Sequence, residues 1–477
     1  MNNSLKQSVM SGVKWLALTK IIIQVFRWGS TFWVIRQLNP NDYGVMAIAE
    51  IVVNILVAIN YLCIGNIIIR HKHISKSVID TLFSFCLLIG LLLFLIQFIS
   101  APYFSAFYQT PEAKSVLQML AFAYLIECFN VKPLALMAKN LEFKKLAQID
   151  LIAGILTPAS TIIAALYGLG YWSLAIGYIM HTLVRLFMAN YLYPNALSLK
   201  WHYRKTSKLM KFGIQNSLSG AIAQIGNSLD FIIGGLLYST SAIGIYQVGL
   251  QIAFIPLRKI APELKRLSFP AFCKVSHDLS LVSSYYSKTI RLFSWIIFPI
   301  FWGLGIIAEK VITLVVTDKW AESAIIIQIL CWALPLKLLN EITLTVLNAL
   351  GRSDLVLKNS ITPTVFLLIS IISFQYMGIQ GLAISWCISI FLSYIVLLSD
   401  IRKVLMLSNR SIFNTHIQAI LSSAAMYLSL FFLNGITNLS GVYFLFANGF
   451  IGIAVYCLST FIINKKIFKE LNDLLRG

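Results

Sequence analysis

Charged residues are scarce in this 477-residue chain: they make up 12% of it, whereas a soluble domain carries roughly 25%. Acidic residues are the scarcest, since 18 Asp and Glu stand against 38 Lys and Arg. Hydrophobic residues make up 58% of the chain, and the mean hydropathy is +0.80. This balance excludes a disordered protein, which cannot be so apolar, and an ordinary soluble enzyme. The composition indicates a protein embedded in a lipid bilayer.

The sequence also lacks the motifs of nucleotide, metal and hydrolytic chemistry. It contains no G-x-x-x-x-G-K-[ST] sequence, so no ATP-binding P-loop is present, and D-x-D, H-E-x-x-H and G-x-S-x-G are absent as well. Seven cysteines occur without any C-x-x-C pair, and most lie in apolar stretches. They are interpreted as small core residues rather than as metal ligands or disulfides. We therefore expect no cofactor and no metal site.

Apolar stretches of about 20 residues, the length that crosses a bilayer, recur along the whole chain. Turn and charge signals separate them into fourteen predicted spans: 13–35, 44–66, 78–100, 114–133, 148–167, 173–194, 212–237, 243–264, 288–308, 323–349, 359–376, 382–400, 415–434 and 442–463. No connection between spans is long enough to form a separate domain. The predicted fold class is an all-α, polytopic membrane protein with about 14 transmembrane helices.

Positive residues are concentrated on one side of the predicted spans. Loops after even-numbered spans, together with both chain ends, carry most of the Lys and Arg, and Lys132 is counted among them. Loops after odd-numbered spans carry only Arg36, Lys114, Lys310 and Lys319. Because cytoplasmic loops are rich in Lys and Arg, both termini are expected in the cytoplasm. The net charge of +20 is then a signal of topology, and no nucleic-acid partner is expected.

Short segments recur at an offset of about 200–210 residues, which indicates an internal repeat. The matching pairs are 42–45 with 242–245, 139–141 with 350–352, and 173–176 with 381–384. Six spans per copy is an even number, so the repeat is parallel, although short apolar motifs also recur by chance. The predicted organisation is an N-terminal lobe over 1–211, a C-terminal lobe over 212–410, and two extra spans with a cytoplasmic tail over 411–477. Two six-span lobes around a central cleft form a transporter architecture.

Several spans carry polar side chains on one helix face, which must meet protein or water rather than lipid. In the first span, Lys20, Gln24 and Arg27 follow one another at spacings of four and three. Cationic groups suit a phosphate or diphosphate, and amides suit the hydroxyl groups of sugars. The predicted substrate-binding residues are Lys20, Gln24, Arg27, Arg185, Asn216, Asn227, Gln247, Gln251 and Arg258.

Some of these residues have a purely structural alternative. Lys20 and Arg258 lie within reach of the membrane interface and could extend to water without binding substrate. Three carboxylates, Glu50, Asp230 and Glu341, are candidates for carrying a coupling proton or sodium ion. Pairing between lobes explains Glu50 and Asp230 equally well, and Glu341 lies one helical turn from Lys337, a spacing typical of an ion pair.

Prolines inside the predicted spans have a mechanical consequence. Pro158, Pro256, Pro262 and Pro335 are expected to kink or break their helices. Kinked helices beside a cleft suit a protein that bends or rocks between two access states, although packing alone also explains them.

Four segments resemble the polysaccharide (O-antigen type) flippases of the multidrug/oligosaccharidyl-lipid/polysaccharide (MOP) exporter superfamily. They are RQLNPNDYG at 36–44, NLEFKK at 140–145, GYWSLA at 170–175 and FPA at 269–271. The resemblance extends over nearly the whole chain, including the layout of twelve spans plus two. It implies a bacterial inner-membrane protein that moves undecaprenyl-diphosphate-linked oligosaccharide outward by alternating access, for surface polysaccharide or lipopolysaccharide biosynthesis. It also implies lipid-linked oligosaccharide and membrane lipid as partners, with a polysaccharide polymerase and glycosyltransferases as further candidates.

Two other functions stay open at this point. Another MOP exporter would move a peptidoglycan precursor or drugs, although a drug pump is expected to have a more acidic and aromatic pocket. A membrane-embedded polymerase or glycosyltransferase is less favoured, because such enzymes use a long external loop for catalysis. The longest external connections here run over 101–113 and 309–322. We therefore expect a transporter and not an enzyme.

Overall fold

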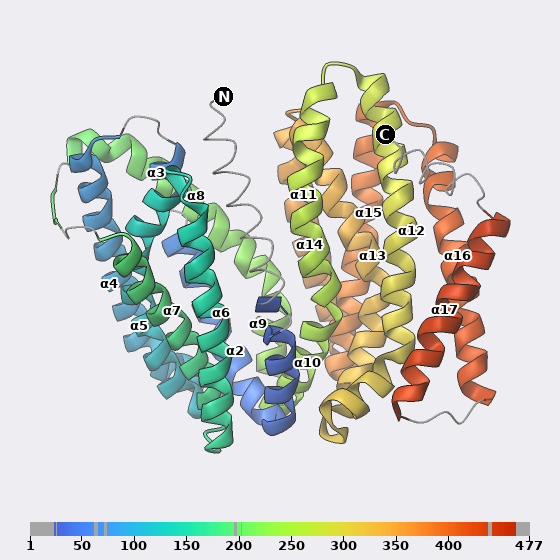
Figure 1. Cartoon of the computed structure of the whole chain (residues 1–477), viewed down its shortest axis with the longest axis horizontal. Helices are drawn as coiled ribbons and strands as arrows, with labels where there is room; N and C mark the ends of the chain where they lie inside the picture. Colours follow the sequence, from blue (N-terminus) through green and yellow to red (C-terminus); the bar gives the residue numbers. More distant parts are fainter. Residues whose placement is uncertain are drawn as a thin grey trace. The chain divides into compact units, whose positions relative to one another are not determined.

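The structure, a computed structural model, describes residues 23–24, 26–61, 65–70, 74–194, 198–201, 203–436 and 441–463. These residues form helices joined by short turns, and no strand occurs among them, which confirms the predicted all-α class. A helix over 26–37 comes first. The helices that follow (Figure 1) are α2 (Pro40–Tyr61), α3 (Gly65–Arg70), α4 (Lys76–Phe107), α5 (Glu112–Lys139), α6 (Phe143–Leu166), α7 (Trp172–Leu192), α8 (Tyr203–Asn227), α9 (Leu229–Leu237), α10 (Thr240–Ala253), α11 (Ile255–Val275), α12 (Leu279–Val311), α13 (Ala321–Ala349), α14 (Ser353–Phe374), α15 (Gly378–Leu405), α16 (Asn409–Ile436) and α17 (Gly441–Ile463).

Ten segments of the described residues are long and apolar enough to cross a membrane, and the number rises to twelve if each of two bent helix pairs is counted as one span. One of the ten, Ser353–Leu405, comprises both α14 and α15. Much of the first predicted span, 13–35, lies outside the described residues. The chain is thus a multi-pass membrane protein, and the count of fourteen spans stays a prediction.

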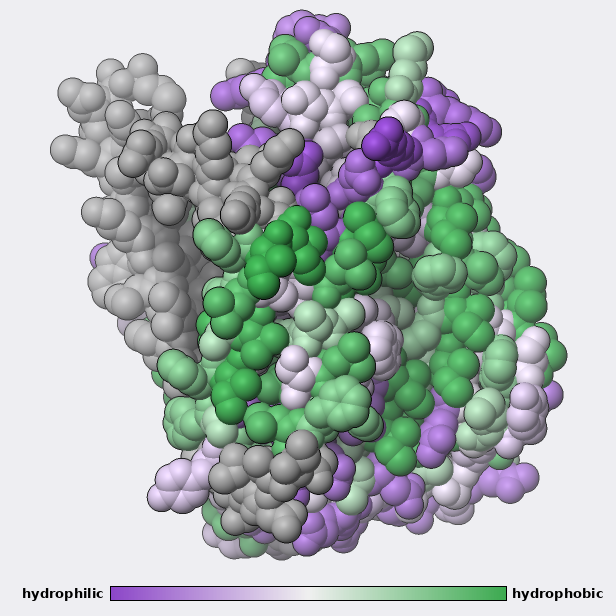
Figure 2. All heavy atoms as spheres, turned by 90° about the vertical axis from the view of Figure 1, so that its right-hand side faces the viewer, coloured by the Kyte–Doolittle hydropathy of each residue, from purple (hydrophilic) through white to green (hydrophobic). Residues whose placement is uncertain are grey.

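The surface of α16 and α17 shows how the chain meets lipid. Figure 2, which views this side of the molecule, shows a broad hydrophobic band with hydrophilic residues gathered at its two ends. Exposed apolar side chains on these two helices include Phe431, Phe432, Phe446, Phe450, Ile453 and Leu458. So much exposed aromatic and aliphatic surface would be unfavourable in water, and it matches the hydrocarbon interior of a bilayer.

Contacts divide the chain into two compact units, Met1–Gly244 and Ile245–Gly477. In the first unit α4 packs against α5, α6 against α7, and α8 against α2 and α4. In the second unit α13 packs against α12 and α15, and α12, α16 and α17 pack against one another. The predicted lobe boundaries at 211/212 and 410/411 follow the sequence repeat rather than contacts, and they stay a prediction.

The turn between α6 and α7 shows why two of the resembling segments have their particular residues. Asp42, in the first turn of α2, accepts hydrogen bonds from the backbone N–H of Asn39 at 2.9 Å and of Tyr171 at 3.0 Å. Gly170 has a φ of +52°, and a Cβ there would lie 2.7 Å from the Asp42 carboxylate. Glycine is therefore required both by the backbone conformation and by the close approach. The segments 36–44 and 170–175 thus fold as one cap over the start of α2.

Two helix pairs are sharply bent. Between α10 and α11 the break at Phe254 bends the chain by 44°, and Pro256 lies in the first turn of α11. This confirms the break expected at Pro256, because proline suits a first helical turn but not a helix interior. The other three prolines lie inside helices that continue past them: Pro158 in α6, Pro262 in α11 and Pro335 in α13.

The second bend, of 46°, separates α8 from α9 at Ser228 and was not predicted. It contains no proline, and Gly226 and Ser228 flank the break instead. Glycine and serine together are a recognised cause of helix kinks.

Candidate functional site

Arg27 and Gln24 lie on the helix that precedes α2. The Arg27 side chain is exposed and that of Gln24 is half-buried. Ser30, one turn later on the same helix, is buried, and its hydroxyl donates a hydrogen bond to the Arg27 carbonyl oxygen at 2.9 Å. Lys20, the third predicted member of this face, lies outside the described residues.

Arg185 is half-buried on α7, and its charge acts on two other ionisable groups. One is Glu127 of α5, and the other is the imidazole of His181, one turn earlier on α7. The charge of Arg27 acts on the same imidazole. The structure therefore brings two of the predicted cationic residues, 158 positions apart in the sequence, to one histidine within the first unit.

Hydrogen bonds fix the helices around this group. Asn130 Nδ2 donates to Glu127 Oε2 at 3.3 Å and to the Thr182 carbonyl oxygen at 3.3 Å, which joins α5 to α7. His181 Nδ1 lies 3.3 Å from the Thr157 hydroxyl of α6. Glu127 and Asn130 were missing from the predicted set. Their spacing of three, which places them on one face of α5, was the available signal.

Asp230 and Asn227 lie on either side of the α8–α9 bend. Asp230 is fully buried in the first turn of α9, where the helix dipole favours a negative charge, and Asn227 is exposed at the end of α8. The Tyr108 hydroxyl donates to the Ile232 carbonyl oxygen at 3.2 Å, which fastens α9 to the end of α4. The side chain of Asn216 is outside what the structure describes.

The first matching segments of the repeat touch each other at the start of α2 and α10. A Cβ on Gly44 would lie 1.8 Å from the Thr240 carbonyl oxygen, and one on Gly244 would lie 1.8 Å from the Pro40 carbonyl oxygen. Each glycine thus approaches the first residue of the other helix, and only glycine allows the two backbones to come so close.

The second unit holds the remaining predicted polar residues. Gln247 and Gln251 are half-buried on α10, and Arg258 is exposed on α11 beyond the bend at Phe254. Glu341 of α13 forms an ion pair with Lys265 of α11. On the same helix, Lys337 Nζ lies 4.8 Å from the centroid of the Trp386 ring.

Of the other two coupling candidates, Asp230 is buried as described above and Glu50 is half-buried on α2. The charge of Glu50 acts on the phenol of Tyr43, two turns earlier on α2.

One buried ion pair corrects the sequence interpretation. Lys132 was counted as a loop cation, but it lies inside α5, with Nζ 2.9 Å from Asp80 Oδ1 of α4. The Lys132 and Asp80 side chains are 5% and 0% exposed, and Nζ also lies 5.5 Å from the centroid of the Phe83 ring. The prediction was wrong because Pro133 was taken as the end of the span, whereas α5 continues to Lys139.

With this geometry in place, comparison with known proteins decides the family. A family profile described as "Polysaccharide biosynthesis protein" matches residues 34–325, more than half of the chain. The chain belongs to this family. Among its relatives is the teichuronic acid biosynthesis protein TuaB of Bacillus subtilis (strain 168), which is 24% identical over 368 residues that make up 74% of this chain and 73% of TuaB. The lipopolysaccharide biosynthesis protein WzxC of Escherichia coli (strain K12) is 23% identical over 409 residues, 83% of this chain and 82% of WzxC.

Solved structures show the same fold. The lipid II flippase MurJ, in an inward closed conformation, matches with a TM-score of 0.76 at 12% identity, over 95% of this chain and 99% of MurJ. An inward-facing multidrug resistance MATE transporter of the MOP superfamily matches with a TM-score of 0.63 at 15% identity, over 83% of this chain and 98% of the transporter. This member of the polysaccharide biosynthesis family therefore has the MOP transporter fold. The resemblance to MOP polysaccharide flippases, read from four short segments, is confirmed.

Proposed function

We propose that this protein flips undecaprenyl-diphosphate-linked oligosaccharide repeat units across the bacterial inner membrane, for surface polysaccharide or lipopolysaccharide biosynthesis. The family and the transporter fold supply the general activity. The observation that supports the substrate class is that Arg27 and Arg185, on two helices of a membrane protein, both lie within electrostatic reach of His181. Such groups are costly in a bilayer unless an anion or water meets them.

In this proposal the two arginines bind the diphosphate. A guanidinium donates two parallel hydrogen bonds to phosphate oxygens, and these bonds are strong because both partners are charged. Glu127, which accepts a hydrogen bond from Asn130, lies within electrostatic reach of Arg185 from α5 and would help to hold the guanidinium for the substrate. Lys20 and Arg258 are further candidates for the diphosphate.

Amide side chains would contact the sugars. Gln24, Asn216, Asn227, Gln247 and Gln251 each offer a donor and an acceptor, which is the pairing that a sugar hydroxyl needs. Alternating access would then carry the head group across while the lipid tail stays in the bilayer. The helix pairs α8–α9 and α10–α11 are bent at Ser228 and Phe254. We propose that these bends are the hinges of the conformational change.

The energy source is proposed to be an ion gradient or removal of the product. Glu50, Asp230 and Glu341 stay our candidates for carrying a proton or sodium ion. For Glu341 the ion pair with Lys265 gives a specific route, since protonation of the carboxylate would release Lys265 from its partner. Both termini in the cytoplasm, and contact with a polymerase and glycosyltransferases, are also part of this proposal.

Complementation tests the two arginines. A strain without this gene receives Arg27→Ala or Arg185→Ala, and Arg352→Ala serves as the control because Arg352 is paired with Asp354 at 2.8 Å in an exposed turn. We expect surface polysaccharide to fall at least tenfold in the first two variants and to stay at the wild-type level in the third. Protein level in the membrane is measured alongside, and Arg185→Lys should recover part of the activity. Wild-type polysaccharide in both Arg27→Ala and Arg185→Ala would contradict the proposed site.

A further inference from the structure

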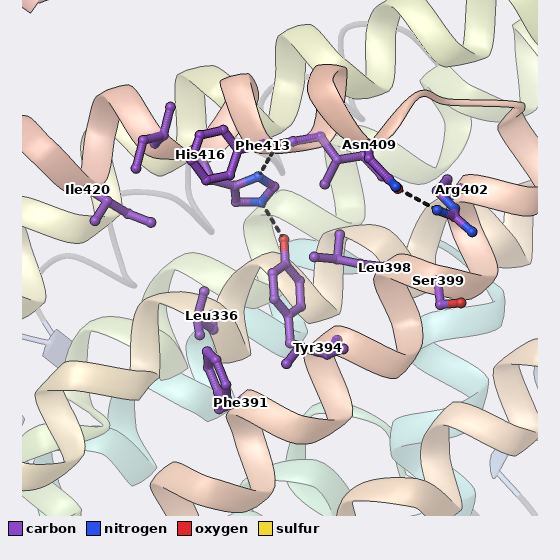
Figure 3. Close-up of a pocket in the computed structure, with 13 residues that line it drawn as sticks. Leu336, Phe391, Tyr394, Leu398, Ser399, Arg402, Asn409, Phe413, His416 and Ile420 are labelled. Carbon is purple, nitrogen blue, oxygen red and sulfur yellow. Dashed lines mark hydrogen bonds between the residues drawn. The ribbon is translucent and has the colours of Figure 1, made fainter.

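The second unit contains an apolar groove of about 560 Å³ between α15 and α16, with Leu336 of α13 also lining it (Figure 3). Its other apolar lining residues include Phe391, Ile395, Leu398, Phe413, Ile417 and Ile420, and we call it the α15–α16 groove. Phe391 and Phe413 are more than half exposed, so the groove opens at the surface of the unit. Nothing in the proposed transport mechanism uses it.

The polar groups inside the groove satisfy one another. The Tyr394 hydroxyl lies 2.7 Å from His416 Nε2, and His416 Nδ1 lies 2.8 Å from the Ile412 carbonyl oxygen (Figure 3). Because a carbonyl can only accept, Nδ1 donates to it, while Nε2 shares a hydrogen bond with the tyrosine hydroxyl. Both ring nitrogens thus have a partner, and the imidazole needs no other. The middle of the groove then suits a hydrocarbon chain and offers nothing to a sugar or a peptide.

One end of the groove is cationic. Arg402 lies there and donates from Nη1 to Asn409 Oδ1, which holds the guanidinium in place and leaves other N–H groups to donate (Figure 3). Lys403 and Arg410 are exposed beside it. Asp400, two residues earlier and hence on the opposite side of α15, is already held by Lys358 at 2.8 and 2.9 Å. Within the described part of the chain, Arg402 has no carboxylate partner, so this end attracts an anion.

The length of the groove indicates which kind of lipid chain fits it. From Phe391 to Arg402 helix α15 rises roughly 16 Å at 1.5 Å per residue. This is about half of the ~30 Å hydrocarbon thickness of a bilayer, and therefore the depth of one leaflet. An acyl chain of a phospholipid fills one leaflet, whereas an undecaprenyl chain is far longer than the groove.

We propose that the α15–α16 groove binds one acyl chain of an anionic membrane phospholipid, with the lipid phosphate at Arg402. The hydrocarbon lies on Phe391, Ile395 and Ile417, and the cations at the end select a negatively charged head group over a zwitterionic one. This site contains neither Arg27 nor Arg185, and it does not depend on the substrate proposed for transport.

Lipid binding to the purified full-length protein tests the proposal. Delipidated protein is titrated in detergent with phosphatidylglycerol or with phosphatidylcholine of the same acyl chains, and bound lipids are counted by native mass spectrometry. The wild type should prefer phosphatidylglycerol by about fivefold, the ratio expected for one interfacial cation. Arg402→Gln should remove most of this preference, because only Lys403 and Arg410 then remain at this end, and Arg402→Lys should keep most of it. Lys274→Gln, which removes an exposed cation at the end of α11, should keep all of it.

A second variant distinguishes binding of the acyl chain from binding of the head group. Ile417→Trp fills the groove and leaves Arg402 in place, so it should weaken binding of both lipids, and its melting temperature reports whether it has folded. Equal binding of the two lipids to the wild type, or an unchanged preference in Arg402→Gln, would overturn the proposal. Displacement of phosphatidylglycerol by undecaprenyl phosphate would also overturn it, because the groove would then belong to the transported lipid. Since no transport is measured, failure here leaves the proposed function untouched.

Discussion

Replacing Lys132 with methionine should destabilise the protein by about 3–5 kcal/mol, the cost of leaving one partner of a buried ion pair without the other. Asp80 is fully buried, and the Lys132 ammonium lies 2.9 Å from its carboxylate. The lost contact with the Phe83 ring adds on the order of 0.5–2 kcal/mol. A methionine fills a similar volume, so the measured loss reports charge rather than a cavity.

Two further variants make this experiment decisive. Lys145→Met removes a lysine from the same unit that pairs with Glu142 at 2.7 Å. This pair is partly exposed, because the Lys145 side chain is 39% and the Glu142 side chain 28% accessible. The expected loss there is at most about 1 kcal/mol. The double variant Asp80→Asn with Lys132→Met removes both charges and should recover most of the stability. Unfolding is followed by denaturant titration in detergent. A loss for Lys132→Met no larger than that for Lys145→Met would refute the reasoning.

Three further predictions address contacts elsewhere in the chain. Gly44→Ala should reduce surface polysaccharide strongly, because the new Cβ would lie 1.8 Å from a carbonyl oxygen, whereas Gly303→Ala meets a side chain only at 3.8 Å and should behave as wild type. Glu341→Gln should cost less than about 1 kcal/mol in an unfolding assay, since its ion pair is partly exposed, but should flatten the pH dependence of transport. The hydroxyl of Ser280 holds the pKa of Asp278 below its ordinary value. The ionised Asp278 therefore stabilises the folded protein fully at pH values above its ordinary pKa, and this stabilisation is lost as the pH falls through the lowered pKa of the folded state. Melting temperatures of Asp278→Ala and wild type should therefore converge in acid.

The membrane helices and the break at Pro256 could be predicted because each depends on local sequence. Apolar length gives a helix that spans the bilayer, and proline disrupts a helix wherever tertiary structure does not hold it. Pro133 shows the limit of this reasoning: α5 continues beyond it, and packing against α4 buries Lys132 on Asp80. The break at Ser228 contains no proline, and Gly226 and Ser228 are a weaker local signal for a kink.

The sequence predicted the residues of the candidate site within each helix separately, but not the contacts between helices. Spacing within a helix identified Arg27 and Arg185 separately, but it cannot show that both act on His181, because that depends on which helices meet. The spacing of Glu127 and Asn130 was visible in the sequence, but the effect of Arg185 on Glu127 was not, because Arg185 lies on another helix. Contacts between distant segments need the folded structure or many related sequences.

The most direct test of the account is the leaflet in which lipid-linked repeat units build up when this gene is deleted. Undecaprenyl-diphosphate-linked oligosaccharide is extracted from the deletion strain, and its access to a membrane-impermeant glycan-modifying enzyme is measured in spheroplasts and in inverted vesicles. The account predicts accumulation in the cytoplasmic leaflet, with little surface polymer, and reversal by the wild-type gene. Accumulation in the periplasmic leaflet would contradict it, because transbilayer movement would then proceed without this protein.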